Sequence, residues 1–461
     1  MGASLEIMQR APLVSLPLRA ALAATLAGLL STAACSDDGT SNAGGQPEGG
    51  GGSAEGGAGG GEAADPLGLA DCPGEATTLG DPLALPAIDW TSDDGAVEAT
   101  CALRALDAVV EPTKIICLGE NAHGVSESSR WHAIVARYLV HRFHVRVIAY
   151  EAPGASSDAW GRYVTGGDAE ELENGFADSK SSLGDSIEQE HLINAFRDVQ
   201  LELPEGDALR VTGFDVAVQD KATRASLVAY LEAANPAGAE AQVSALGSGD
   251  YLERAEAADE IAAAVEADAG AYAELTSEAA TKAALRDALN LADGYRFLDR
   301  YTEGDFWDGN KRFREPGMIR NIGTLLSELA EGERMVLISH NGHCGRDMSS
   351  SGDPSEAATW PAFGTHFASE LGADYYVLGQ VYGSGKQLTI NGTEQLIHSP
   401  DGSLEALLND TITTPASAFA TSTSAFDLGQ SYDMENMAAV VPAEQFDAMI
   451  YVRDVTPITL R

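Results

Sequence analysis

The sequence predicts an α/β fold: a mostly parallel sheet with flanking helices and a helical insertion capping the carboxyl ends of the strands. Two apolar runs, Lys114–Gly119 and Val145–Tyr150, enclose a turn and an amphipathic stretch, which is the pattern of a βαβ unit. Neither run alternates with polar residues, as expected for strands covered on both faces. About residues 220–310 are rich in Ala, Glu and Leu with few strand formers, which predicts the helical insertion.

The other elements follow from the same kind of pattern. Between the first two strands, apolar residues recur at i, i+3, i+4, i+7 and i+8, the spacing of a helix that buries one face. This stripe comprises Trp131, Ile134, Val135, Tyr138 and Leu139. Further strands are predicted at Leu209–Phe214, Met335–Ser339, Tyr375–Leu378 and Ala448–Val452. Gly383–Lys386 is too short for a phosphate-binding loop and is interpreted as a hairpin.

The composition limits the possible partners. The 461 residues include 28 Lys or Arg and 70 Asp or Glu, giving a net charge of −42. Such an acidic chain repels the phosphates of nucleic acids and is poorly suited to anionic lipid surfaces, so no nucleic-acid partner is expected. Because 44% of the residues are hydrophobic, the chain can bury a core, and wholesale disorder is excluded.

The N-terminus has the pattern of an export signal. Arg10 and Arg19 precede the apolar residues 20–30, and small residues lead to Cys35, which predicts a lipoprotein-type signal peptide over residues 1–34. In this interpretation Cys35 is lipidated and is the only membrane contact, with Thr32 replacing the usual leucine of the motif. The alternative is ordinary signal cleavage nearby, with Cys35 lost or free. Both alternatives export the protein, and the first anchors it in the cell envelope, on the periplasmic side or the outer surface.

The export signal is followed by a Gly-rich segment and then by the folded body. Residues 35–78 are interpreted as a flexible tether, and residues 79–461 as one domain that contains the insertion. Export would leave four cysteines in an oxidising compartment. A bridge between Cys72 and Cys101 is possible, and Cys117 is interpreted as a small core residue, although sequence cannot choose between pairings.

Ionisable residues follow the predicted strands. In an open parallel sheet, ligands bind beyond the carboxyl ends of the strands. The residues at these ends are Glu120, His123, Glu151, Asp215, His340 and His343. The zinc-protease, phosphate-loop and serine-hydrolase motifs are absent, and a cysteine nucleophile at Cys344 is an open alternative. The pattern that remains is a histidine base oriented by carboxylates, which can deprotonate water.

Eight spaced motifs make the chain similar to the erythromycin esterase family over about residues 79–461. They are residues 118–124, 148–152, 213–215, 314–321, 339–343, 363–366, 374–379 and 447–452. The resemblance implies that His123 is the base, that Glu120 and Glu151 belong to its cluster, and that His340 and His343 line the cleft.

Among the substrate-binding candidates, the positions of Asp215 and Arg314 match family motifs. Two positions depart from the pattern. Glu315 replaces the usual Asp, and His132 stands where the family has a basic residue that would contact substrate. Arg130, on the preceding turn, could substitute for it only if the helix is rotated.

The resulting hypothesis is a hydrolase of carboxylic esters or macrolide-type lactones that uses water activated by His123 and needs no cofactor. A metal-dependent hydrolase is the first alternative, with Glu120, His123, His340 and His343 as ligands of a divalent ion. The second is a lipoprotein that binds a small ligand in the same place without turnover. The resemblance does not fix the natural ester.

Overall fold

The computed structural model describes residues 65–73, 78–88, 95–177, 183–218, 221–235, 238–348, 362–434 and 437–461. The strands are β1 (Leu83–Leu85), β2 (Ile115–Glu120), β3 (Val145–Pro153), β4 (Arg210–Asp215), β5 (Arg334–His340), β6 (Tyr375–Leu388), β7 (Glu394–Ile397), β8 (Ala416–Ala420), β9 (Tyr432–Met434), β10 (Met437–Val440) and β11 (Ala448–Val455).

The helices that matter most for the site are α4 (Ser126–Phe143), α14 (Glu315–Ser327) and α15 (Asn341–Cys344). The π-helix η3 (Asn310–Arg314) leads directly into α14. The other described helices are α2 (Ala96–Leu103), α3 (Asp107–Val110), α5 (Gly154–Val164), α6 (Ala169–Gly175), α7 (Ile187–Glu202), α8 (Lys221–Ala234), α9 (Ala239–Gly247), α10 (Tyr251–Ala267), α11 (Ala269–Leu275), α12 (Glu278–Thr302), α13 (Phe306–Gly309), α17 (Phe363–Leu371), α18 (Leu404–Thr411) and α19 (Pro442–Gln445), with short 3₁₀ turns η1 (Leu69–Asp71), η2 (Arg104–Leu106) and η4 (Gly372–Asp374).

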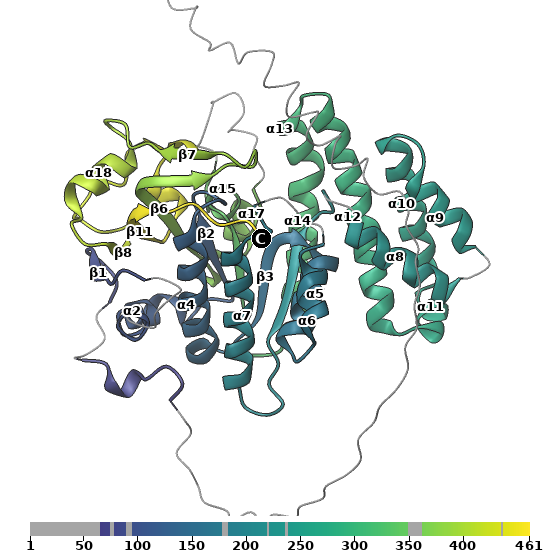
Figure 1. The fold of residues 1–461 in the computed structure, drawn as a ribbon, viewed down its shortest axis with the longest axis horizontal. Helices are drawn as coiled ribbons and strands as arrows, with labels where there is room; N and C mark the ends of the chain where they lie inside the picture. Colours follow the sequence, from purple (N-terminus) through teal and green to yellow (C-terminus); the bar gives the residue numbers. More distant parts are fainter. Residues whose placement is uncertain are drawn as a thin grey trace, which may run out of the picture. The chain divides into compact units, whose positions relative to one another are not determined.

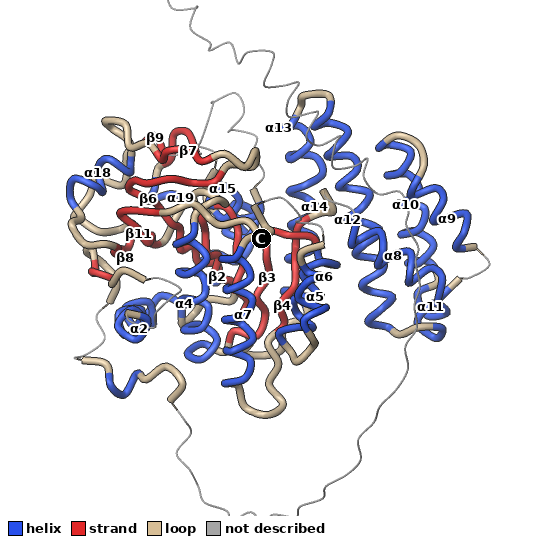
Figure 2. The backbone as a smooth tube through the Cα atoms, viewed as in Figure 1, coloured by secondary structure: helices blue, strands red, loops and turns tan. Residues whose placement is uncertain are grey.

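The central sheet is mostly parallel, as predicted. Its order is β1-β8-β11-β6-β2-β5-β3-β4, with β7 paired to β6 (Figures 1 and 2). The six strands from β11 to β4 are parallel, and they include every strand predicted from the sequence. Strands β1, β7 and β8 are antiparallel additions that were not predicted. The segment Gly383–Lys386 belongs to a hairpin, as interpreted, but it lies in the first strand and not in the turn: β6 and β7 pair antiparallel, and the turn follows Leu388.

Helices cover both faces of the sheet because the buried strands are apolar on both sides. On β2, Ile116 and Leu118 pack into a cluster that includes Trp131 of α4. The alternate residues Ile115 and Cys117 pack into a second cluster with α14 and α17. Fully burying a side chain such as Leu or Ile contributes roughly 1.5–3 kcal/mol, so both layers hold the strands in register.

The predicted amphipathic helix is α4. All five residues of its apolar stripe are buried, which confirms the prediction. The helix ends where His144 adopts a left-handed conformation with φ of 55°, and β3 begins at the next residue. The turn between β2 and α4 is therefore held by a buried strand on one side and a buried helix on the other.

The predicted insertion is helical and comprises α8 to α13. It leaves the sheet at the carboxyl end of β4, where the backbone N–H of Ala217 donates to the carbonyl of Asn290 on α12. Arg286 of α12 also binds Asp158 of α5 at 2.9 Å. Figure 2 shows these helices beside β4, with α13 beyond the carboxyl end of that strand. The chain then returns through η3 and α14 to the site.

Two disulfide bonds join neighbouring cysteines along the chain. Cys72 is bonded to Cys101, as considered from the sequence, and Cys117 is bonded to Cys344. Cys117 is a fully buried core residue, as interpreted, and its bond to Cys344 in addition ties β2 to α15. The first bond and the buried Leu67 place residues 65–73 in the compact unit, which begins at Asp65, so the predicted boundary at residue 79 lies within it.

The signal peptide, Cys35 and most of the predicted tether lie outside the described residues. In the part of the chain that is described, no helix is both long and apolar enough to cross a membrane.

We expect the Cys117–Cys344 bond to stabilise the fold more than the Cys72–Cys101 bond. The Cys117–Cys344 bond joins residues 227 positions apart, and the Cys72–Cys101 bond joins residues 29 positions apart. A bond that closes a longer loop removes more conformational entropy from the unfolded chain. Replacing both members of either pair by Ala should lower the free energy of unfolding by about 2–5 kcal/mol, with the larger loss for Cys117 and Cys344. Urea denaturation under oxidising conditions measures both losses. Equal losses, or none, would contradict the expectation.

Candidate active site

The carboxyl end of β2 carries a carboxylate–histidine pair. Glu120 is the last residue of the strand, and its Oε1 lies 2.6 Å from Nδ1 of His123 in the following turn. The turn is fixed by Gly124, whose carbonyl accepts hydrogen bonds from the backbone N–H groups of Leu388 and Ile458. A Cβ at position 124 would lie 1.8 Å from the carbonyl oxygen of Leu388, so only glycine fits there.

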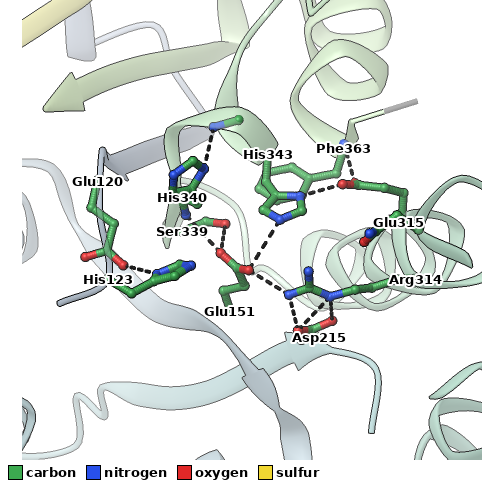
Figure 3. A network of polar contacts seen from close by, with 12 residues as sticks. Glu120, His123, Glu151, Asp215, Arg314, Glu315, Ser339, His340, His343 and Phe363 are labelled. Atoms are coloured by element: carbon green, nitrogen blue, oxygen red, sulfur yellow. Dashed lines mark hydrogen bonds and ion pairs between the residues drawn. The ribbon is translucent and has the colours of Figure 1, made fainter. Parts of the chain in front are cut away.

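His123 combines an exposed ring with a fixed orientation. Its side chain is 47% exposed, and Figure 3 shows the second ring nitrogen, Nε2, directed away from Glu120. Burial of the site lowers the pKa of His123, but the hydrogen bond and charge of Glu120 outweigh this, so the pKa is raised from 6.5. Burial likewise opposes ionisation of Glu120, yet its contacts with His123 keep its pKa below the ordinary value. A hydrogen bond from Nδ1 to an ionised Glu120 leaves Nε2 as the basic nitrogen.

Glu151 lies at an irregularity in the neighbouring strand. The pairing of β3 with β4 shifts between Tyr150 and Pro153, with one more residue on β3 than on β4. Such a bulge redirects side chains at the end of a strand. Here it directs Glu151 toward β5, where its Oε2 accepts hydrogen bonds from the Ser339 hydroxyl at 2.7 Å and from the backbone N–H of His340 at 2.9 Å.

Arg314 joins two of the predicted carboxylates. Its Nη2 lies 2.7 Å from Glu151 Oε1 and 2.7 Å from Asp215 Oδ2, and its Nε lies 3.0 Å from Asp215 Oδ1 (Figure 3). The residue ends the π-helix η3, and π-helical turns are frequently found at functional sites. Asp215 and Arg314 were predicted to bind substrate; the structure pairs them with each other at the end of β4, and their contact with substrate stays a prediction.

His343 is enclosed by two carboxylates. Its Nδ1 is hydrogen-bonded to Glu315 Oε1, and its Nε2 lies 3.3 Å from Glu151 Oε1. Burial opposes a charged ring, but the charges of Glu151 and then Glu315 dominate and raise the pKa of His343 to about 10. Glu315 is completely buried, and its other oxygen accepts the backbone N–H of Phe363 at 2.9 Å. The imidazolium of His343 is thus a fixed positive charge near neutral pH.

Burial of Glu151 favours its neutral form, but the charge and hydrogen bond of His343 and the charge of Arg314 hold its pKa well below the ordinary value. The partners of this carboxylate come from β5, η3 and α15. Glu151 is consequently the point at which these segments meet.

His340 lies between the exposed pair and the buried network. Its Nδ1 accepts the backbone N–H of Gly342 at 3.1 Å, so its Nε2 is the protonated nitrogen, which lies 3.1 Å from the carbonyl of Asn121. Burial and the charge of His123 lower its pKa to about 4. The rings of His123 and His340 are 5.3 Å apart between centroids. His340 is therefore a neutral ring with both nitrogens engaged.

The other two residues predicted to contact substrate, Arg130 and His132, lie on α4. His132 is buried, with Nε2 3.4 Å from the carbonyl of Gly119, so it faces the strand. Arg130 is half-buried on the same helix. A Cys344 nucleophile is contradicted because its sulfur is bonded to Cys117.

The residues proposed as an alternative metal site fit a cation poorly. His343 has a carboxylate at each ring nitrogen, and both nitrogens of His340 contact backbone groups. A metal ligand must offer a lone pair from an unprotonated nitrogen. Within the described ranges, no group of three or more His, Cys, Asp or Glu side chains is arranged to hold a metal ion.

Several members of this network were not singled out from the sequence as site residues: Ser128, Glu315 and Ser339. Glu315 was noticed only as a departure from a motif, and Ser339 only as part of one. Ser128, which donates to Glu120, carries no signal of its own because it lies on a helix among other serines.

We expect His343 to make stability depend on alkaline pH. Because its pKa is raised from 6.5 to about 10 in the folded state, the folded protein binds more protons between these values. The free energy of unfolding should therefore fall as pH rises from about 6.5 to about 10. Glu315→Gln removes one carboxylate partner and should end this decline at a lower pH. Urea titrations at several pH values test this, with exposed Glu331→Gln as the matched control. If Glu315→Gln kept the wild-type pH dependence, His343 would not be the group responsible for the decline.

Comparison with solved structures identifies the fold. A Bacillus cereus protein shares 16% identity at a TM-score of 0.65, covering 83% of this chain and 97% of that one. A protein described as a succinoglycan biosynthesis protein shares 15% identity at a TM-score of 0.62, covering 83% and 96%. A mutant of the erythromycin esterase EreC, in its open conformation, shares 16% identity at a TM-score of 0.61, covering 77% and 94%. At these identities the likeness is one of fold.

The sequence comparisons identify the family. No curated protein matches the chain. Residues 140–455, more than half of the chain, match the family model described as erythromycin esterase. The matched region contains Glu151, Arg314 and His343, whereas Glu120 and His123 precede it. The chain belongs to the erythromycin esterase family.

Proposed function

We propose that the protein hydrolyses a carboxylic ester or a macrolide-type lactone with water activated by His123. The observation that carries this proposal is the Glu120–His123 pair: a 2.6 Å contact at the carboxyl end of the sheet, with an exposed ring and a raised pKa. Of the three histidines in the site, His340 has a pKa of about 4 and His343 one of about 10. A general base works best when its pKa lies near the working pH, which favours His123.

The proposed reaction adds water to the carbonyl carbon. His123 Nε2 takes a proton from the water as the new C–O bond forms, and Glu120 stabilises the resulting imidazolium through Nδ1. The ester C–O bond then breaks, and His123 returns the proton to the departing alkoxide, giving a carboxylic acid and an alcohol. A lactone gives both groups in one opened product.

The buried network has a supporting role in this proposal. Arg314 and the His343 imidazolium are fixed positive charges held by Glu151 and its neighbours. Fixed charges that need no reorganisation stabilise the developing oxyanion better than mobile water does. Arg314 binds Glu151 and Asp215 through its Nε and Nη2 atoms. We therefore assign the remaining nitrogen, Nη1, as the donor to the oxyanion.

We expect no resident metal, and neither alternative function is favoured by the described residues. Hydrolysis of p-nitrophenyl esters and of macrolides, with and without chelator, separates the three hypotheses. Activity that survives chelator supports the proposal. Activity lost with chelator and restored by a divalent ion supports a metallohydrolase. Tight binding of a macrolide without turnover supports the binding protein.

His123→Ala should lower kcat by about 10²–10⁴-fold, the usual contribution of a general base. The fold should survive because the half-exposed ring contributes little to the core. In the wild type, kcat/KM should rise with pH along a limb whose apparent pKa exceeds 6.5, since that of His123 is raised. Exposed His398 provides the matched control, His398→Ala, which should retain activity. Near-wild-type hydrolysis by His123→Ala would exclude the mechanism.

We also propose that the mature protein is exported and tethered to a membrane through lipid on Cys35. The order of the cationic leader, Cys35 and the Gly-rich segment supports this. Cys35→Ser should release the protein into the soluble fraction or leave the precursor uncut. Cell fractionation and N-terminal mass spectrometry distinguish these outcomes. A soluble wild-type protein that begins downstream of Cys35 would contradict the tether.

A further inference from the structure

Glu120 has a second hydrogen bond that the proposed reaction does not use. Its Oε1 faces His123, and its Oε2 accepts the hydroxyl of Ser128 at 2.8 Å. Ser128 lies in the first turn of α4, and its side chain is fully buried. Each oxygen of the carboxylate therefore has its own partner: the His123 ring at Oε1 and the buried Ser128 hydroxyl at Oε2.

We propose that Ser128 is a positioning residue: it holds Glu120 so that one carboxylate oxygen faces His123. This inference rests on the proposed function, in which His123 is the base. The hydroxyl donates to Glu120 on β2 and not to a backbone carbonyl of its own helix. The hydrogen bond therefore spans two elements and fixes the start of α4 to the end of β2.

The other polar side chains around Glu120 have hydrogen-bond partners of their own. Tyr382 of β6 is fully buried; burial and the charge of Glu120 hold its pKa well above the ordinary value, and its hydroxyl donates to Gln380 at 3.3 Å. His132 faces the Gly119 carbonyl, and burial lowers its pKa, so it carries no charge near neutral pH. Among the described residues, the side chains of Ser128 and His123 donate hydrogen bonds to Glu120.

The terminal torsion of a glutamate has a broad energy profile, so a carboxylate held on one side only can rotate. Rotation would misalign the acceptor of the Nδ1 proton and would disturb the direction of Nε2. Binding of the ester would be little affected, because Ser128 is buried and does not reach solvent. Loss of the hydroxyl should therefore change kcat and leave KM near its wild-type value.

Three variants test the role in the full-length protein with the best ester substrate found. Ser128→Ala removes the hydroxyl and should lower kcat by about 10–100-fold, the range expected when a hydrogen bond to a charged group is lost. Ser128→Thr keeps the hydroxyl and should recover much of this loss. Ser129→Ala, at the adjacent half-buried serine, is the matched control and should behave as wild type. Circular dichroism and thermal unfolding confirm that each variant is folded.

A second measurement does not depend on turnover. In protein with isotope-labelled histidine, the NMR titration of His123 is assigned by its disappearance in His123→Asn. The pKa of His123 should fall in Ser128→Ala, because the aligned bond to Glu120 that raises it is weakened while burial still lowers it. The other charged groups that act on His123 are Glu151 of β3 and His343 of α15, whereas Ser128 lies on α4.

The outcomes separate the two proposals. An unchanged or higher pKa of His123 in Ser128→Ala, or an unchanged kcat, would overturn the positioning role. A change in KM with unaltered kcat would do the same, because it would assign Ser128 to substrate binding. If the wild type cleaves no ester, the proposed function fails, and the NMR titration alone still decides whether Ser128 orients the Glu120–His123 pair.

Discussion

The buried charge of Glu151 is the constraint on which the site depends. An ionised carboxylate removed from water is stable only when its oxygens are occupied by donors or cations. Four groups meet this need: Arg314, His343, the Ser339 hydroxyl and the backbone N–H of His340. They come from separate segments, so satisfying one carboxylate fixes the relative positions of β3, β5, η3 and α15. A missing partner would leave an uncompensated charge, which typically costs about 3–5 kcal/mol.

The three histidines illustrate how environment divides one residue type into three states. His343 is charged because two carboxylates enclose it, and His340 is neutral because it is buried among backbone groups. His123 has one carboxylate partner and an exposed ring, so both of its protonation states are accessible. In the proposed mechanism, the two buried histidines maintain the geometry of the site and the exposed His123 transfers the proton. Membership of the erythromycin esterase family is consistent with this division, since ester hydrolysis needs one mobile proton and stable charges around it.

The parallel strands were predictable because each is a run of apolar residues without alternation, such as Met335–Ser339. The antiparallel strand β1 was missed because it has only three residues and lies at the edge of the sheet, and β8 was missed because its sequence is mostly Ala and Ser, which are weak strand formers. The contact between Glu120 and His123 was suggested by their closeness along the chain. The pairing of Arg314 with Asp215, 99 residues away, depends on how η3 returns from the insertion, and local sequence does not specify this. Likewise, the orientation of His132 depends on the rotation of α4 about its axis. The bond between Cys117 and Cys344 depends on the position of α15 relative to β2.

The order of the cysteines affects how the protein can be made. Of the four cysteines in the described ranges, the first is bonded to the second and the third to the fourth. A chain that enters an oxidising compartment with its N-terminus first presents these thiols one after another, so pairing them in order of arrival yields the native bonds. Cys344 nevertheless enters the compartment 227 residues after Cys117. During this interval Cys117 has no native partner and can form bonds with other thiols. Production in a reducing cytosol would leave both bonds unformed, and the yield of correctly assembled protein would then depend on oxidation during refolding.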